Sequence, residues 1–231
     1  MKEVLTEVRT EKIGNITLHN MDNMDFMRTV PDKYFDLAIV DPPYGIGASK
    51  FGSYGSVKTR FTKYHKKNWD DKTPDFSYFD ELFRVSKNQI IWGGNYFQLP
   101  NKHRWIIWDK IIPDGCDYGE YELAWNSSEL KGKIFRLSSS WNNGGNSSDR
   151  QAKTAKARIH PTQKPVALYK WLLKNYAKEG DKILDTHLGS GSIAIACHDY
   201  KFELVGTEID SDYFNAAVKR IKQHVAQTTL F

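Results

Sequence analysis

The sequence predicts an α/β fold in which helices flank a single doubly wound, mostly parallel sheet of seven strands. Three observations support this prediction. Short apolar stretches rich in β-branched residues alternate with segments whose apolar residues recur at helical spacing. The end of the chain, residues 182–226, follows the order strand, helix, strand, helix, which requires parallel pairing and right-handed crossovers. With 231 residues, 40% of them hydrophobic and 26% charged, the chain has the size and composition of one globular domain, expected to span residues 1–231.

The individual elements follow from local patterns. Residues 36–40 form a short apolar run after a Pro-Asp turn, and residues 89–92 form another that ends at a Gly-Gly pair. Residues 120–125 alternate as a hairpin partner would, whereas residues 77–85 place three apolar side chains on one helical face. In chain order we expect strands at residues 16–19, 36–40, 89–92, 105–108, 120–125, 182–185 and 203–207, and helices at residues 22–29, 77–85, 163–178, 192–200 and 212–226.

The helix at residues 163–178 has the clearest end signals. Thr162 suits its N-cap, Pro165 is tolerated in its first turn, and Gly180 follows its last turn. The segment before it, residues 126–158, is mostly polar and contains an Asn/Gly-rich loop apex. We therefore expect residues 126–158 to be a small insertion in the domain.

The composition of the chain argues against several classes of protein. No stretch approaches the roughly 20 apolar residues of a membrane span, and the N-terminal residues lack the apolar core of a signal peptide. Cys116 and Cys197 lie far apart and without metal-ligand spacing, so neither a disulfide framework nor a cysteine zinc site is expected. The sequence predicts a soluble, cytoplasmic protein that needs no metal.

The net charge of +5 is unevenly distributed along the chain. Residues 46–68 carry six basic side chains and no acid, and residues 131–158 carry seven basic side chains against one acid. Each segment therefore contributes +6, which leaves −7 on the rest of the chain. Two basic segments on an acidic body are typical of loops that contact phosphates, although two solvated loops would look the same.

A glycine-rich motif lies between the expected strand at residues 182–185 and the helix that follows it. Gly189 and Gly191 allow a sharp turn and a close approach to a ligand, and the helix offers free backbone amides. Glu208 follows the next strand, where a carboxylate can accept hydrogen bonds from ribose hydroxyls. This context predicts a nucleoside-containing cofactor and does not by itself separate NAD from others.

A second motif, Asp41-Pro42-Pro43-Tyr44, directly follows the apolar strand at residues 36–40. Ligands of open α/β sheets bind beyond the carboxyl ends of the strands, so this tetrapeptide lies where chemistry takes place. Asp41 and the Pro42 carbonyl can accept both hydrogens of an exocyclic amine while Tyr44 stacks on its ring. Such contacts favour the nitrogen lone pair as a nucleophile.

With these motifs the chain resembles the S-adenosylmethionine-dependent amino-methyltransferases of DNA. Residues 41–44 resemble the catalytic motif in its adenine-preferring Asp-Pro-Pro-Tyr form, and residues 185–191 resemble the cofactor loop. Residues 160–165, His-Pro-Thr-Gln-Lys-Pro, are similar to the motif that precedes that loop. The order of the three motifs is that of the circularly permuted β-group. Thr186-His187 replaces the Pro-Phe usual in the family.

The resemblance implies a Rossmann-like methyltransferase fold and S-adenosylmethionine as cofactor. Glu208 would hold the ribose, Asp185 would lie near the methionine amino group, and Thr162 and Lys164 would face its carboxylate. Asp22 would contact the adenine of the cofactor or cap a helix, and His187 would be a packed or cofactor-adjacent side chain rather than a base. The expected cofactor-binding residues are Asp22, Thr162, Lys164, Asp185, His187, Gly189, Ser190, Gly191 and Glu208.

The resemblance also implies site-specific transfer of a methyl group to N6 of an adenine flipped out of duplex DNA, as in restriction-modification. Residues 126–158 would read the sequence, and residues 46–68 would contact phosphates. Because β-group relatives often dimerise, a homodimer stays open. The expected DNA-binding residues are Lys50, Lys58, Arg60, Lys63, Lys66, Lys67, Arg136, Arg150 and Arg158.

Three alternatives stay open. An RNA amino-methyltransferase would use the same chemistry but normally places its glycine loop first. An NAD-dependent oxidoreductase would explain Gly189, Gly191 and Glu208 but not residues 41–44. A nucleic-acid-binding module with a vestigial cofactor site would explain the basic segments.

Overall fold

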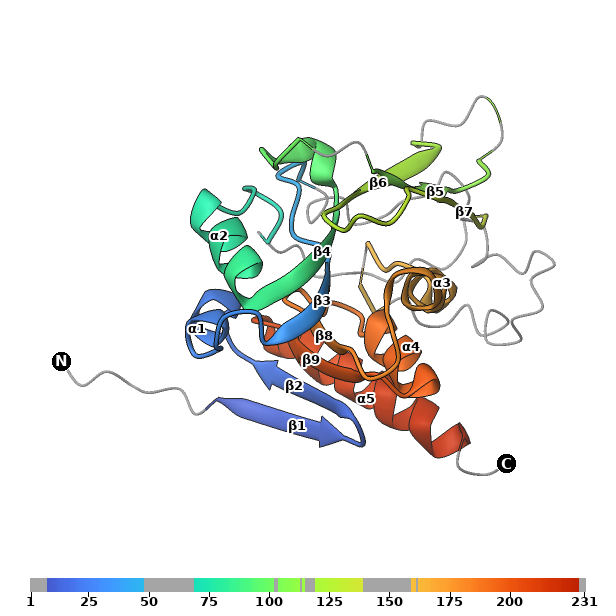
Figure 1. Ribbon diagram of the computed structural model, residues 1–231. Coiled ribbons are helices and arrows are strands. Elements are labelled where there is room, and N and C mark those ends of the chain that lie inside the picture. Colours follow the sequence, from blue (N-terminus) through green and yellow to red (C-terminus); the bar gives the residue numbers. More distant parts are fainter. Residues whose placement is uncertain are drawn as a thin grey trace.

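The computed structural model describes residues 8–47, 69–101, 104–112, 114, 119–138, 159–160 and 162–228. In this part of the chain nine strands form one mixed sheet in the order β1-β2-β9-β8-β3-β4-β6-β5-β7 (Figure 1). The strands are β1 (Arg9–Ile13), β2 (Ile16–Asn20), β3 (Phe35–Val40), β4 (Ser86–Trp92), β5 (Ile106–Asp109), β6 (Tyr121–Asn126), β7 (Ile134–Arg136), β8 (Lys182–Asp185) and β9 (Glu203–Thr207). The helices are α1 (Asn23–Arg28), α2 (Phe76–Val85), the short 3-10 helix η2 (Gly94–Tyr96), α3 (Val166–Tyr176), α4 (Ser192–Tyr200) and α5 (Ser211–Thr228).

The sheet differs from the expected seven strands at both of its edges. The continuous parallel region runs β2-β9-β8-β3-β4. β1 pairs antiparallel with β2, and β6 pairs antiparallel with both β4 and β5, whereas the outer strand β7 pairs in parallel with β5. β1 and β7 form the two outer strands, and their side chains are mostly exposed. Because an edge strand buries little surface, its sequence lacks the apolar run or clear alternation by which the seven expected strands were found.

The core is divided between the two faces of the sheet, as a doubly wound fold requires. In β3, Leu37 and Ile39 belong to one buried cluster, which also contains side chains of α3, α4 and α5. Ala38 and Val40 point to the other face, where the buried cluster includes side chains of α1 and α2. Successive residues of a strand face opposite sides, so a continuous apolar run fills both cores.

Helix α3 begins three residues later than the sequence predicts. Its N-cap is Pro165 with extended backbone angles, and Gln163 donates its amide hydrogen to the His160 carbonyl in a turn before the helix. The residue before a proline is disfavoured in helical conformation, so Lys164 cannot begin the helix. The expectation that Thr162 is the N-cap is therefore wrong. Residues 162–164 precede the helix and are not part of its first turn.

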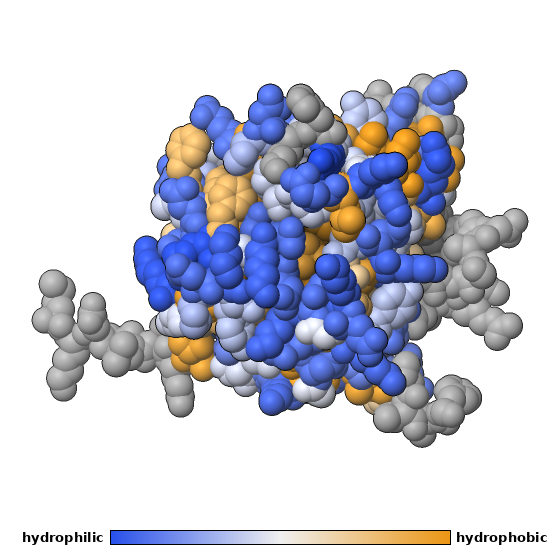
Figure 2. Space-filling model, in the orientation of Figure 1, coloured by the Kyte–Doolittle hydropathy of each residue, from blue (hydrophilic) through white to orange (hydrophobic). Residues whose placement is uncertain are grey.

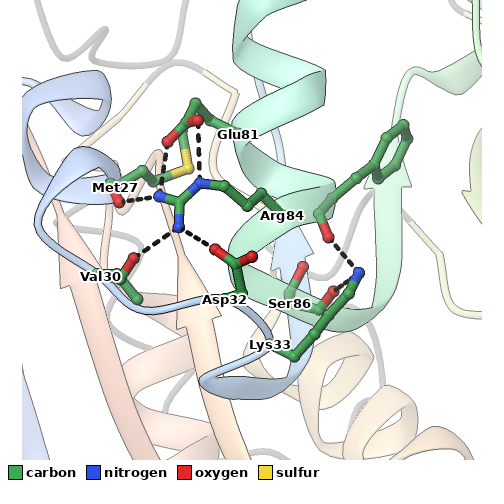
Figure 3. Close-up of polar contacts among 8 residues, drawn as sticks. Met27, Val30, Asp32, Lys33, Glu81, Arg84 and Ser86 are labelled. Atoms are coloured by element: carbon green, nitrogen blue, oxygen red, sulfur yellow. Dashed lines mark hydrogen bonds and ion pairs between the residues drawn. The ribbon is translucent and has the colours of Figure 1, made fainter.

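Arg84 of α2 fixes the connection that leads into β3 (Figure 3). Its guanidinium donates to the carbonyls of Met27 and Val30 and forms ion pairs with Asp32 and Glu81 at 2.7 and 2.8 Å. Arg84 thus gives further donors to carbonyl groups at and just after the end of α1, where regular intrahelical hydrogen bonds end. These contacts hold the start of β3 against α2, and β3 leads directly to residues 41–44.

The surface in the orientation of Figure 1 is mostly hydrophilic, and apolar side chains gather at its β5–β7 end (Figure 2). Ile111, Tyr121 and Ile134 are exposed large apolar side chains of this end. None of the helices in the described ranges combines the length and apolar character needed to cross a membrane.

Candidate active site

The two motifs meet at the carboxyl edge of the parallel strands. β3 ends at Val40, directly before Asp41, and pairs in parallel with β8, which ends at Asp185. From this pair the sheet continues in opposite directions, through β9 on one side and β4 on the other. Such a switch point opens a crevice beyond the strand ends and is the usual ligand site of open α/β sheets.

Asp41 is held by two donors, one from its own motif and one from the motif at residues 160–165. The Tyr44 hydroxyl donates to Asp41 Oδ1 at 2.6 Å, and the ammonium of Lys164 lies 2.6 Å from Oδ2. Lys164 Nζ also donates to the Tyr44 hydroxyl oxygen at 3.2 Å. The Lys164 side chain is only 3% exposed. The segment directly before α3 therefore places a buried cation on the catalytic motif, and the role of Lys164 at the cofactor carboxylate stays a prediction.

A further carboxylate, Glu122 of β6, shares this cation. Its Oε2 lies 3.0 Å from Lys164 Nζ, and its Oε1 lies 2.8 Å from Lys110 Nζ. Burial alone would raise the pKa of Glu122, but Lys164 and Lys110 outweigh it and lower that pKa to about 2. For Asp41, burial raises the pKa, Lys164 opposes the rise and the charge of Glu122 adds to it.

The Tyr44 ring is packed by aromatic neighbours and by the backbone after β4. Tyr96 stacks on it with centroids 5.0 Å apart and an interplanar angle of 11°, and Phe97 meets it edge-on. Gly93 has φ +66°, and a Cβ at this position would clash with the Tyr44 ring. Only glycine therefore fits at the end of β4 while Tyr44 occupies this position.

The glycine loop after β8 is held by carboxylates that bind backbone amides. Asp185 Oδ1 accepts from the His187 amide at 3.0 Å, and Glu208 Oε2 accepts from the Gly189 amide at 2.9 Å. Gly191 has φ +70° and is the N-cap of α4. Burial raises the pKa of Asp185 to about 8. The loop thus presents a buried acid beside a glycine turn that leads into a helix.

His187 is half-buried and packs against side chains of α1 and α2. Its Nε2 is 3.1 Å from Asn23 Nδ2, and its Nδ1 is 2.9 Å from the Thr186 hydroxyl. Burial lowers its pKa to about 4, so the ring is neutral at pH 7. A shallow cavity of about 240 Å³ lies beside it, and Pro43 and Tyr78 contribute to its lining. These contacts pack the His187 side chain beside a cavity, and whether a cofactor lies next to it stays a prediction.

A profile of the family described as DNA methylase, whose name covers both N6 and N4 methylation, matches residues 95–219. The chain belongs to this DNA methylase family. It is 24% identical over 235 residues to the type II methyltransferase M.HpaI of Haemophilus parainfluenzae, a match that covers 84% of this chain and 70% of that protein.

Two solved structures support the fold of this DNA methylase. The crystal structure of an M1.HpyAVI–SAM complex superposes with a TM-score of 0.55 at 18% identity and covers 89% of this chain and 99% of the other. The PvuII DNA methyltransferase, described as cytosine-N4-specific, gives a TM-score of 0.56 at 11% identity and covers 92% of each chain. The doubly wound α/β fold is therefore shared with DNA methyltransferases.

Two predicted cofactor residues of the methylase have local structural partners. Asp22 is the N-cap of α1, where its side chain accepts from the amides of Met24 and Asp25, as the helix-cap alternative predicts. The Thr162 hydroxyl lies 3.1 Å from His160 Nδ1. The His160 ring lies beside Gly189 and contacts the rings of Trp69 and Tyr213. The segment before α3 therefore packs directly on the glycine loop.

The predicted Ser190 is buried within the same loop. Its hydroxyl lies 3.1 Å from that of Ser192, and Arg220 of α5 donates to its carbonyl at 2.8 Å. Arg220 thus fixes the end of the glycine loop from the neighbouring helix.

Of the predicted DNA-binding residues, Arg136 lies within the described ranges. Arg136 ends β7, is 64% exposed and lies 3.2 Å from Asp109. Within the described ranges, no group of three or more His, Cys, Asp and Glu side chains could hold a metal ion. The remaining predicted DNA-binding residues lie outside those ranges: Lys50, Lys58, Arg60, Lys63, Lys66, Lys67, Arg150 and Arg158.

Sequence reasoning missed three residues of the site: Glu122, Lys110 and Tyr96. One signal was available for Glu122, because it lies inside an otherwise largely apolar strand, where an acid needs a buried partner. Tyr96 follows the Gly-Gly pair that ends β4, but no pattern in the sequence connects it with Tyr44.

Proposed function

We propose that this chain is a site-specific DNA methyltransferase that transfers a methyl group from S-adenosylmethionine to N6 of adenine. In this proposal it is a circularly permuted β-group enzyme with an Asp-Pro-Pro-Tyr catalytic motif. The observation that carries the proposal is the position of Asp41 and Tyr44 at the switch point, next to the Asp185–Gly191 loop. The order of the motifs along the chain supports the permuted arrangement.

The residues of the glycine loop fit S-adenosylmethionine. Asp185 is 3% exposed, and no lysine or arginine in the described part of the chain forms an ion pair with it. A buried carboxyl without a paired cation suits the amino group of the methionine moiety. Glu208 follows β9, where its carboxylate can accept from ribose hydroxyls. Asp185, Gly189, Gly191 and Glu208 would hold the cofactor, which supplies a methyl group on a positively charged sulfur.

The catalytic motif fits the exocyclic amine of a base. The Asp41 carboxylate and the Pro42 carbonyl accept the two amine hydrogens, which concentrates the lone pair on the nitrogen. No hydrogen bond to the Pro42 carbonyl is found among the described residues, so this acceptor is available. As the nitrogen gains the methyl group, Asp41 takes up the proton that the amine loses.

Duplex DNA is the proposed partner. The amine of a stacked base cannot reach Asp41, so the target base must leave the helix and stack on Tyr44. Residues 126–158 are proposed to read the sequence, and the basic residues 46–68 are proposed to contact phosphates. A homodimer remains a prediction from the resemblance alone.

The test is transfer of a labelled methyl group from S-adenosylmethionine to duplex DNA, followed by digestion to nucleosides and identification of the labelled product. We expect label in N6-methyladenine. Label in N4-methylcytosine would overturn the choice of base, and label only in RNA would support the RNA alternative. Cofactor binding without transfer to any substrate would indicate a vestigial site.

A further inference from the structure

A chain of alternating charges extends from Asp41 to a residue outside every recognised motif. Asp41 pairs with Lys164 at 2.6 Å, Lys164 with Glu122 at 3.0 Å, and Glu122 with Lys110 at 2.8 Å. The four residues come from the end of β3, the segment before α3, β6 and the residue after β5. The antiparallel part of the sheet is thereby connected electrostatically to the catalytic motif.

The position of Lys164 would be a disadvantage for Asp41 if the two formed an isolated pair. A buried lysine held by a single carboxylate neutralises it, and a neutralised carboxylate accepts poorly from a further donor. Here the lysine charge lies between two carboxylates, since Glu122 is also within ion-pair distance. Both carboxylates raise the pKa of Lys164 against the opposing effect of burial.

We infer that Glu122 is a positioning residue for the methyl transfer, because by sharing Lys164 it leaves Asp41 able to accept from the target amine. This inference rests on the proposed function for the reaction that Asp41 serves. Glu122 does not itself contact Asp41. It acts through the ammonium of Lys164, and Lys110 in turn holds the second carboxylate oxygen of Glu122.

Other groups near Asp41 do not replace Glu122. The Tyr44 hydroxyl donates to Asp41, and burial keeps the pKa of Tyr44 well above its usual value, so this group stays neutral. The phenols of Tyr78 and Tyr169 are also buried, with raised pKa values, and remain protonated. Asp185 is neutral below about pH 8 because burial raises its pKa. Glu122 is the acid that shares Lys164 with Asp41.

The decisive variant is Glu122→Gln, compared with Glu120→Gln, which removes an exposed carboxylate two residues earlier. Without the Glu122 charge, Lys164 pairs with Asp41 alone, so the pKa of Asp41 falls and its carboxylate becomes a weaker acceptor. We expect kcat to fall about tenfold, with little change in KM for DNA or cofactor, and the acid limb of the kcat profile to move to lower pH. Glu120→Gln should match the wild type, and Glu122→Asp should restore the acid limb.

A second variant should move the same limb in the opposite direction. In Lys110→Met, Glu122 loses its other cation and acts more strongly on Lys164, so the pKa of Asp41 rises and the acid limb moves to higher pH. If the acid limb of the kcat profile stays unchanged in both variants, Glu122 has only a structural role and the inference is overturned. This holds even if the melting temperature of the variants falls.

A readout without catalysis separates this inference from the proposed function. The Asp41 carboxyl carbon can be titrated by NMR in the free protein, and its pKa should fall in Glu122→Gln and rise in Lys110→Met. If the wild type methylates nothing but these shifts occur, the proposed function fails and the electrostatic arrangement stands. If transfer occurs but Asp41 titrates identically in all three proteins, the inference fails and the proposed function stands.

Discussion

The carboxylates of the catalytic half and of the cofactor half are held in different ways. On the catalytic side, Asp41 and Glu122 share the buried ammonium of Lys164, and Glu122 also pairs with Lys110. On the cofactor side, the Asp185 carboxylate accepts from a backbone amide, without an ion pair to a lysine or arginine in the described ranges. One half is therefore charge-balanced within the protein, whereas the other retains a buried acid.

This difference indicates which half requires a charged ligand. Asp185 loses solvation without a cation to compensate, and its pKa rises to about 8. A ligand with an ammonium group would restore the charge balance there. The catalytic half needs no such ligand, because Lys164 and Lys110 already balance Asp41 and Glu122, and it can receive a neutral amine.

The largest effect is expected for Asp41→Ala, which removes the acceptor from the balanced half. Transfer should fall by about a thousandfold or more, because an acceptor that acts on the reacting amine is lost. Cofactor affinity, measured by calorimetry, should remain within a few-fold of the wild type. Asp25→Ala, which removes an exposed acid of α1, is the control for both measurements. An equal loss of transfer and cofactor binding would mean that the two halves are not separate.

The next largest effect is expected for Asp185→Asn, which changes the buried acid of the cofactor half. The amide keeps the shape and can still accept from the His187 amide, but it cannot pair with an ammonium group. Cofactor affinity at pH 8 should fall about thirtyfold to a hundredfold, as when one partner of a buried charge pair is removed. Wild-type affinity should increase as the pH rises toward 8, whereas the variant should show little of this dependence. Equal affinities of the two proteins at pH 8 would exclude Asp185 as the partner of the cofactor amine.

Asp185→Asn should weaken cofactor binding but increase the free energy of unfolding of the cofactor-free protein. The pKa of Asp185 is about 8 in the folded protein and about 4 in an unfolded chain. The folded state therefore binds this proton more tightly, so its contribution to stability is present below pH 4 and is lost as the pH rises toward 8. Asp185→Asn, which cannot ionise, should be more stable than the wild type by up to about 5 kcal/mol at pH 8, by about 1 kcal/mol at pH 5, and nearly equal below about pH 4. Denaturant unfolding without cofactor measures this difference, and equal stabilities at pH 8 would contradict the raised pKa.

The sequence predicted the parallel centre of the fold and both motifs, for a common physical reason. The central strands are buried on both faces and read as apolar runs, and the turns after them need glycine or proline at fixed positions. β1 and β7 were missed because an edge strand buries too little surface to impose a clear pattern. The pairing of Lys164 with Glu122 was also missed, since it joins residues 42 positions apart through the antiparallel register of β6. Local patterns do not encode such a contact.

The smallest effect is expected for substitutions of Tyr96, which lies where the catalytic half is proposed to meet the target base. It is 48% exposed and stacks on Tyr44, the ring on which the target base is proposed to stack. A base that enters between the two rings contacts both, and stacking of one base on an aromatic side chain stabilises by about 1–3 kcal/mol. Tyr96→Ala should therefore raise KM for DNA about fivefold to tenfold and leave kcat and cofactor affinity nearly unchanged, whereas Tyr96→Phe should match the wild type. A fall in KM would show instead that Tyr96 occupies the place of the base and must leave before catalysis. Fluorescence of 2-aminopurine at the target position would then increase more readily in the alanine variant, because the Tyr44 ring would already be uncovered.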